Sequence, residues 1–255
     1  MRRLALAAAA ALAAGGGARA GEPIWPDPAT ERRMPLAEEA APFQGVGRLN
    51  IAGARFCTAT LVSETEVLTA AHCLFHPRTG KPAALGEMRF VAGHRIDRNA
   101  GVRTVLRAAI APGFALVGNP GPADLRGDVA LLELDAPIWA ARAFAVGPFL
   151  EDDPAPMIVS YARDRAQAPS ITERCPALGG LDAVLVLGCA VERGVSGAPV
   201  FVGEGARARL VAVVAAMGRL PDGGAFALAP LAAPWIATLR ADLAAQAREA
   251  GGAAD

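Results

Sequence analysis

The chain has 255 residues, and 53% of them are hydrophobic, so it can bury one large core or two small ones. Lys and Arg together number 25, as do Asp and Glu, which gives a formal net charge of zero. This balance argues against the basic surface of a nucleic-acid-binding protein and against an acidic tail for a cationic partner.

The N-terminus has the composition of an export signal. Arg2 and Arg3 give it a positive start, residues 4–14 are apolar, and Ala18-Arg19-Ala20 fits the small-x-small pattern of signal peptidase sites. The apolar run is shorter than the roughly 20 residues that a membrane helix needs. We expect a signal peptide over residues 1–20 and an exported protein, periplasmic or secreted. An uncleaved anchor or an amphipathic helix is the alternative.

The expected export affects how the four cysteines are interpreted. In an oxidising compartment they are more consistent with two disulfides than with thiol chemistry. Three connectivities are possible, and we expect the local one, Cys57–Cys73 and Cys175–Cys189, which closes two short loops. The alternative is a metal site built from Cys57, Cys73, His72 and His76. It lacks a paired spacing such as Cys-x-x-Cys and is less favoured.

Residues 21–44 are rich in Pro, Glu and Ala and indicate an extended lead-in without a core of its own. From Gly45 onward, short segments rich in Val, Leu, Ile and Thr alternate with Gly, Pro, Asp and Asn, which predicts an all-β protein. The predicted strands are residues 46–53, 56–63, 66–71, 87–94, 103–110 and 128–135, then 142–147, 156–162, 182–189, 197–203, 209–216 and 224–230.

These segments divide evenly about residue 140. We therefore predict two packed six-stranded antiparallel β-barrels, the first over residues 45–140 and the second over 141–230. The last segment, residues 231–248, has apolar side chains near helical spacing and predicts a C-terminal α-helix. We expect this helix to pack on the second half of the protein rather than on a membrane.

Three short stretches carry candidate catalytic residues. His72 lies near the end of the β-rich run EVLTAAHC, just before Cys73. Asp128 begins the strand-like DVALLELD, and Ser196 lies between glycines in ERGVSGAPVF. Flanking glycines let the backbone turn tightly and aim its N–H groups at one point, as an oxyanion site requires. Taken singly, the three have simpler interpretations: a buried core histidine, a surface turn (or an Arg-Gly-Asp adhesion triplet) and a Gly-Ser turn.

Together, LTAAHC, DVALLEL and GVSGAPV resemble the trypsin-like serine peptidases, in the family's order His72, Asp128, Ser196. An α/β-hydrolase would instead place Ser, Asp and His in that order. The lead-in ERRMPLAEEAAPFQGVGRLN, with Cys175 and Cys189, is similar to the bacterial branch of glutamyl endopeptidases. The resemblance implies the chymotrypsin-like double barrel, a Ser-His-Asp triad and an oxyanion hole formed by the backbone N–H groups of Gly194 and Ser196.

Two departures from the family pattern affect activation and specificity. Many relatives carry Asp just before the serine and pair it with a new N-terminal ammonium, whereas this chain has Val195. We therefore expect the oxyanion loop to be held by its own packing and the nearby disulfide. Ala190, six residues before Ser196, replaces the Asp of trypsin-type pockets, and residues 211–218 contain no histidine for Glu selection. With Ala215 and Met217, this predicts a small or apolar primary pocket.

The sequence therefore predicts an exported serine endopeptidase that acts on protein or peptide substrates through an acyl-enzyme intermediate. The resemblance implies no cofactor, because acyl transfer of this kind needs no metal. We expect a monomer. The alternatives are a catalytically impaired peptidase fold kept as a binding module, for which Val195 and Ala198 give some support, and an esterase using the same triad.

Overall fold

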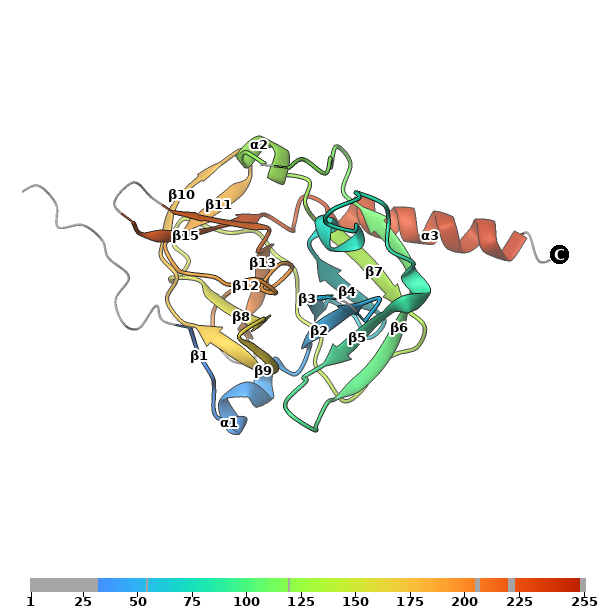
Figure 1. Cartoon of the computed structure of the whole chain (residues 1–255), viewed down its shortest axis with the longest axis horizontal. Helices are drawn as coiled ribbons and strands as arrows, with labels where there is room; N and C mark the ends of the chain where they lie inside the picture. The colour runs from blue at the N-terminus through green and yellow to red at the C-terminus, as the bar shows by residue number, and fades with distance from the viewer. Residues whose placement is uncertain (1–31, 54, 119, 205–206, 220–222, 253–255) are drawn as a thin grey trace, which may run out of the picture.

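The computed structural model of the chain is shown in Figure 1, and the structure describes residues 32–53, 55–118, 120–204, 207–219 and 223–252. The predicted signal peptide and residues 21–31 of the lead-in lie outside the described residues. The described elements are almost all strands, arranged as two lobes, with one long helix at the C-terminal end (Figure 1).

The first lobe is a closed barrel of six strands in the order β2-β3-β4-β7-β6-β5. Its members are β2 (Val46–Ile51), β3 (Arg55–Leu61), β4 (Glu66–Thr69), β5 (Met88–Ala92), β6 (Gly101–Ile110) and β7 (Ala130–Leu134). Successive side chains of a strand point to opposite faces, so every second residue faces the barrel interior. In β5, Met88, Phe90 and Ala92 are buried, while Arg89 is exposed. All six strands predicted for this half are confirmed.

The second lobe consists of two antiparallel sheets rather than one closed ring. One has the order β1-β9-β8-β12-β13 and the other β10-β11-β15-β14. Their strands are β1 (Arg32–Arg33), β8 (Met157–Ala162), β9 (Arg165–Thr172), β10 (Ala177–Leu181), β11 (Val184–Leu187), β12 (Pro199–Val202), β13 (Arg209–Val213), β14 (Ala216–Arg219) and β15 (Ala225–Pro230). The predicted all-β, chymotrypsin-like architecture is confirmed.

Sequence patterns miss part of this second lobe. The sequence predicts a strand over residues 142–147, but in the structure Val146 makes only an isolated bridge to Leu210. Conversely, β9 forms in a segment that contains Pro169, a residue that argues against a strand. The β8–β9 register shifts between Ser160 and Ala162, opposite this part of β9, so the proline lies at an irregularity in the ladder.

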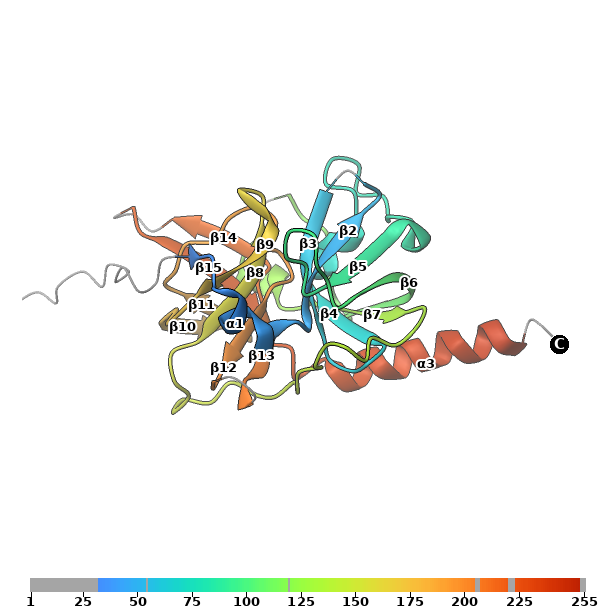
Figure 2. The same ribbon diagram turned by 90° about the horizontal axis from the view of Figure 1, so that it is seen from below.

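The first and last elements of the described chain each pack on the lobe farther away in sequence. The lead-in strand β1 pairs with β9 of the second lobe, and helix α3 (Ile236–Gly252) lies along the first barrel (Figure 2). Arg240 of α3 forms an ion pair with Glu66, and Gln246 donates to the carbonyl of Ala108. The expectation that α3 packs on the second half is therefore wrong.

A shared apolar cluster joins the lobes and explains these crossings. Phe43 of the lead-in, Phe144 of the connecting segment and Phe201 of β12 pack together, with the Phe144 and Phe201 ring centroids 4.5 Å apart. Leu239 and Leu243, one helical turn apart on α3, are buried in the same cluster. Among the described helices, none is long and apolar enough to cross a membrane.

Candidate active site

The histidine and the aspartate meet because β4 and β7 are neighbours in the first barrel. The two strands are antiparallel, and Thr69 at the end of β4 lies opposite Ala130 at the start of β7. His72 follows β4 in the short 3-10 turn η3 (Ala71–Leu74), and Asp128 comes just before β7. The strand register therefore places the two side chains at the same end of the barrel.

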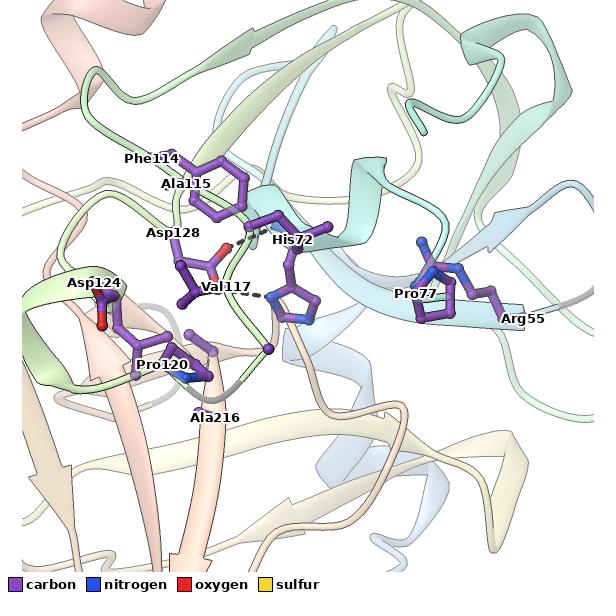
Figure 3. A pocket seen from close by; sticks show the side chains of 14 residues that line it. Arg55, His72, Pro77, Phe114, Ala115, Val117, Pro120, Asp124, Asp128 and Ala216 are labelled. Atoms are coloured by element: carbon purple, nitrogen blue, oxygen red, sulfur yellow. Dashed lines mark hydrogen bonds and ion pairs between the residues drawn. The ribbon is translucent and has the colours of Figure 1, made fainter. Parts of the chain in front are cut away.

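Asp128 binds His72 at two points (Figure 3). Its Oδ2 lies 2.7 Å from His72 Nδ1, and its Oδ1 accepts a hydrogen bond from the His72 backbone N–H at 2.8 Å. Asp128 is only 2% exposed. A buried carboxylate on Nδ1 keeps the proton of a neutral imidazole on that nitrogen and leaves Nε2 as the proton acceptor.

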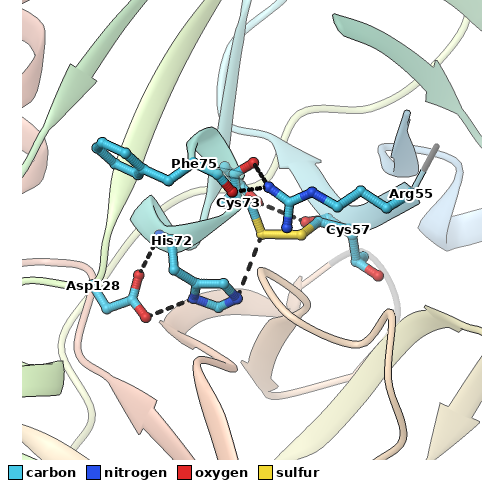
Figure 4. A network of polar contacts seen from close by, with 8 residues as sticks. Arg55, Cys57, His72, Cys73, Phe75 and Asp128 are labelled. Carbon is cyan, nitrogen blue, oxygen red and sulfur yellow. Dashed lines mark hydrogen bonds and ion pairs between the residues drawn. A yellow bond between two sulfur atoms is a disulfide. The ribbon is translucent and has the colours of Figure 1, made fainter. Parts of the chain in front are cut away.

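The two predicted disulfides are present. Cys57 of β3 is bonded to Cys73 of η3, so the turn that carries His72 is covalently tied to a barrel strand (Figure 4). Cys175 is bonded to Cys189, which precedes the Ser196 loop. Because the sulfurs of Cys57 and Cys73 are bonded to each other, the alternative metal site lacks the thiolate ligands it would need.

The Ser196 loop packs directly against this part of the first barrel. Gly194 and Gly197 both have positive φ, at 98° and 78°, which favours glycine. A Cβ atom at Gly197 would also collide with Thr69 Oγ1 and the carbonyl oxygen of Thr58. Gly197 therefore allows the Ser196 loop to approach the end of β4, the strand that comes just before His72 in the chain.

Thr58 of β3 holds the Ser196 loop through hydrogen bonds. Its backbone N–H donates to the carbonyl of Ser196 at 2.8 Å, and its hydroxyl lies 3.1 Å from the carbonyl of Gly194. The same hydroxyl accepts from the backbone N–H of Tyr161 at 3.0 Å. Thr58 is fully buried, so these bonds are shielded from water.

The carbonyls of Gly194 and Ser196 are held, whereas their N–H groups donate no hydrogen bond to any described residue. They are thus available to an external acceptor, as an oxyanion hole requires. The side chains of Ser196 and His72 make no hydrogen bond with each other within the described part of the chain. His72 Nε2 lies 3.8 Å from Cys73 Sγ.

A cavity of about 480 Å³ opens beside His72 and Asp128. Ala215 and Ala216 line one part of it, and Arg55 and Pro77 lie on the other side of His72 (Figure 3). Of the residues predicted for the primary pocket, only Ala215 lines this cavity. Ala190 is exposed, and Met217 is 48% exposed at the surface of β14.

Residues 34–157 match the trypsin family model. A Glu endopeptidase solved in complex with MPD superposes with a TM-score of 0.68 at 15% sequence identity, covering 84% of this chain and 96% of that one. This chain has the trypsin-like, chymotrypsin-type fold. A thermostable serine protease, AL20 from an extremophilic microorganism, matches with a TM-score of 0.59 at 16% identity, covering 75% and 92%. No curated protein sequence matches the chain.

The fold also places near the candidate site residues that sequence patterns did not identify. Thr58 and Arg55 belong to a strand recognised only by its apolar content, and neither lies in a catalytic motif. Phe226 of β15 lies opposite Gly218 of β14, and its ring packs on that glycine. The Thr58 contacts with the Ser196 loop join residues more than 100 positions apart, and the Phe226–Gly218 contact depends on the strand register, so no short motif signals either of them.

Proposed function

We propose that this protein is an exported serine endopeptidase with the triad His72, Asp128 and Ser196. His72 Nε2 accepts the proton of the Ser196 hydroxyl as Oγ attacks a peptide carbonyl, and then donates it to the leaving amine. Asp128 holds Nδ1–H and stabilises the imidazolium. The N–H groups of Gly194 and Ser196 stabilise the oxyanion, and water then hydrolyses the acyl-enzyme.

The observation that carries this proposal is the two-point contact between buried Asp128 and His72, beside the Ser196 loop. In that loop the N–H groups of Gly194 and Ser196 have no acceptor among the described residues. The match to the trypsin family model supports peptidase chemistry. Two disulfides support export, since disulfides persist in oxidising compartments.

The proposal is tested with a fluorophosphonate probe, which labels only an activated serine. We expect labelling of the wild-type protein and none of Ser196→Ala or His72→Ala, with peptide hydrolysis falling at least about a thousandfold. His76→Ala is the matched control, because His76 is exposed and outside the site. Absence of labelling in the folded wild type would favour a binding module, and hydrolysis of esters but not casein would favour an esterase.

We further propose that the oxyanion loop is ordered without zymogen cleavage. Val195 is fully buried in an apolar cluster that includes Cys175 and Cys189, so packing takes the place of an ion pair. Active-site titration should give the same number of sites before and after limited proteolysis. A site count that rises from near zero on cleavage would contradict this.

The primary pocket is proposed to accept small or apolar side chains. Phe226 belongs with Leu228 and Ala216 to one apolar cluster, and its ring covers Gly218. We expect a peptide library to show small residues before the cut bond, and Phe226→Ala to extend this preference to larger apolar residues. A profile dominated by Arg, Lys or Glu would refute the proposal.

A further inference from the structure

Arg55 places a positive charge in the wall of the cavity that contains His72 and Asp128. It is the first residue of β3, two positions before the disulfide-bonded Cys57. Its Nη2 donates to the carbonyl of Cys73 at 2.9 Å and to the carbonyl of Phe75 (Figure 4). The guanidinium is therefore held beside the turn that carries His72.

No carboxylate of the described residues pairs with this guanidinium. Arg55 takes part in no ion pair within the described residues, and its Nη1 and Nε donate no hydrogen bond to any of them. Burial lowers the pKa of Arg55, yet an arginine stays protonated at neutral pH. The cavity thus contains a fixed, partly desolvated cation with unused donors.

The position of Arg55 indicates which part of a substrate it would contact. Ala216, which lines the cavity with Ala215, lies on the side of His72 away from Arg55 (Figure 3). Phe56, next to Arg55, lies against the oxyanion loop, since a Cβ at Gly194 would be 2.6 Å from its ring. Both residues belong to β3, which therefore runs from the oxyanion loop to Arg55. A peptide whose acyl part follows Ala216 would send its leaving part along β3 toward Arg55.

We propose that Arg55 recognises a carboxylate side chain on the leaving side of the substrate, so that the preferred substrates are peptides with Asp or Glu just after the cut bond. This rests on the proposed peptidase function and adds its substrate class. A guanidinium offers two parallel N–H groups to a carboxylate, and such charge-assisted bonds are stronger than neutral ones.

The test compares quenched fluorescent peptides that differ only in Glu or Gln at the first or second position after the cut. We expect wild-type kcat/KM to be about tenfold higher for the better-placed Glu peptide, the gain typical of a charge-assisted hydrogen bond. Arg55→Met should abolish the difference, Arg55→Lys should keep part of it, and Arg55→Glu should favour a Lys peptide. Arg103→Met is the matched control, because Arg103 also donates to backbone carbonyls, those of Ala136 and Pro137.

A purely structural role for Arg55 predicts a different outcome. If Arg55 only holds the His72 turn, Arg55→Met slows Glu, Gln and p-nitroanilide substrates equally, and the proposal is overturned. Equal wild-type rates on the Glu and Gln peptides also overturn it. Binding of both peptides to Ser196→Ala, measured by fluorescence anisotropy, needs no catalysis. Tighter binding of Glu there supports the role of Arg55 even if the wild type cleaves nothing, an outcome that would count against the peptidase function alone.

Discussion

At the scale of single residues, the candidate site depends on buried hydrogen bonds that cross between the lobes, and Thr58 makes several of them. Replacing Thr58 by Val keeps its shape but leaves the Tyr161 N–H and the Gly194 carbonyl without their hydroxyl partner. We expect Thr58→Val to lower the free energy of unfolding by about 1–3 kcal/mol. Because Gly194 would be held less firmly, kcat should fall more than KM rises.

Thr58→Ser is the control, since it keeps the hydroxyl and should restore most of kcat. Urea unfolding and steady-state kinetics on the same samples separate the two effects. If Thr58→Val loses stability but keeps the wild-type kcat, Thr58 supports the fold without positioning the oxyanion loop.

At the scale of elements, two leucines one turn apart anchor α3 in the apolar cluster between the lobes. Leu239 is 1% exposed and Leu243 is 4% exposed. The same cluster contains Val129, the residue after Asp128, and Leu131. We expect Leu239→Ala to destabilise the protein by about 2–5 kcal/mol through the cavity it leaves. Glu249→Ala, at an exposed position of the same helix, should change stability by less than about 0.5 kcal/mol. Comparable losses for both variants, measured by urea unfolding, would show that α3 is not anchored through Leu239.

At the scale of the whole molecule, each disulfide stays within one lobe, with sequence separations of 16 and 14 residues. Apart from the connecting chain, the lobes are therefore held to each other by noncovalent packing. We expect the double variant Cys57→Ala/Cys73→Ala to lose about 3 kcal/mol of stability, from the loop entropy of the unfolded chain. It should also lose more activity than Cys175→Ala/Cys189→Ala at equal folded fraction, because only the first pair ties down the His72 turn. Equal activity of the two variants would contradict that role.

The sequence by itself determined the features whose signals are local. The motifs around His72, Asp128 and Ser196 and the six strands of the first barrel are visible within a few neighbouring residues, and the two disulfides join cysteines 16 and 14 positions apart. Only the tertiary structure decided the rest: that α3 packs on the first barrel, that Pro169 lies within a strand, that Thr58 holds the Ser196 loop, and that Arg55 faces the cavity. The contacts of α3 and Thr58 exist only because the two lobes pack together. Pro169 lies within β9 because β8 and the distant β1 pair with that strand from both sides, and Arg55 reaches the cavity because β3 lies beside the His72 turn. Such neighbours are set by the fold and not by any short pattern.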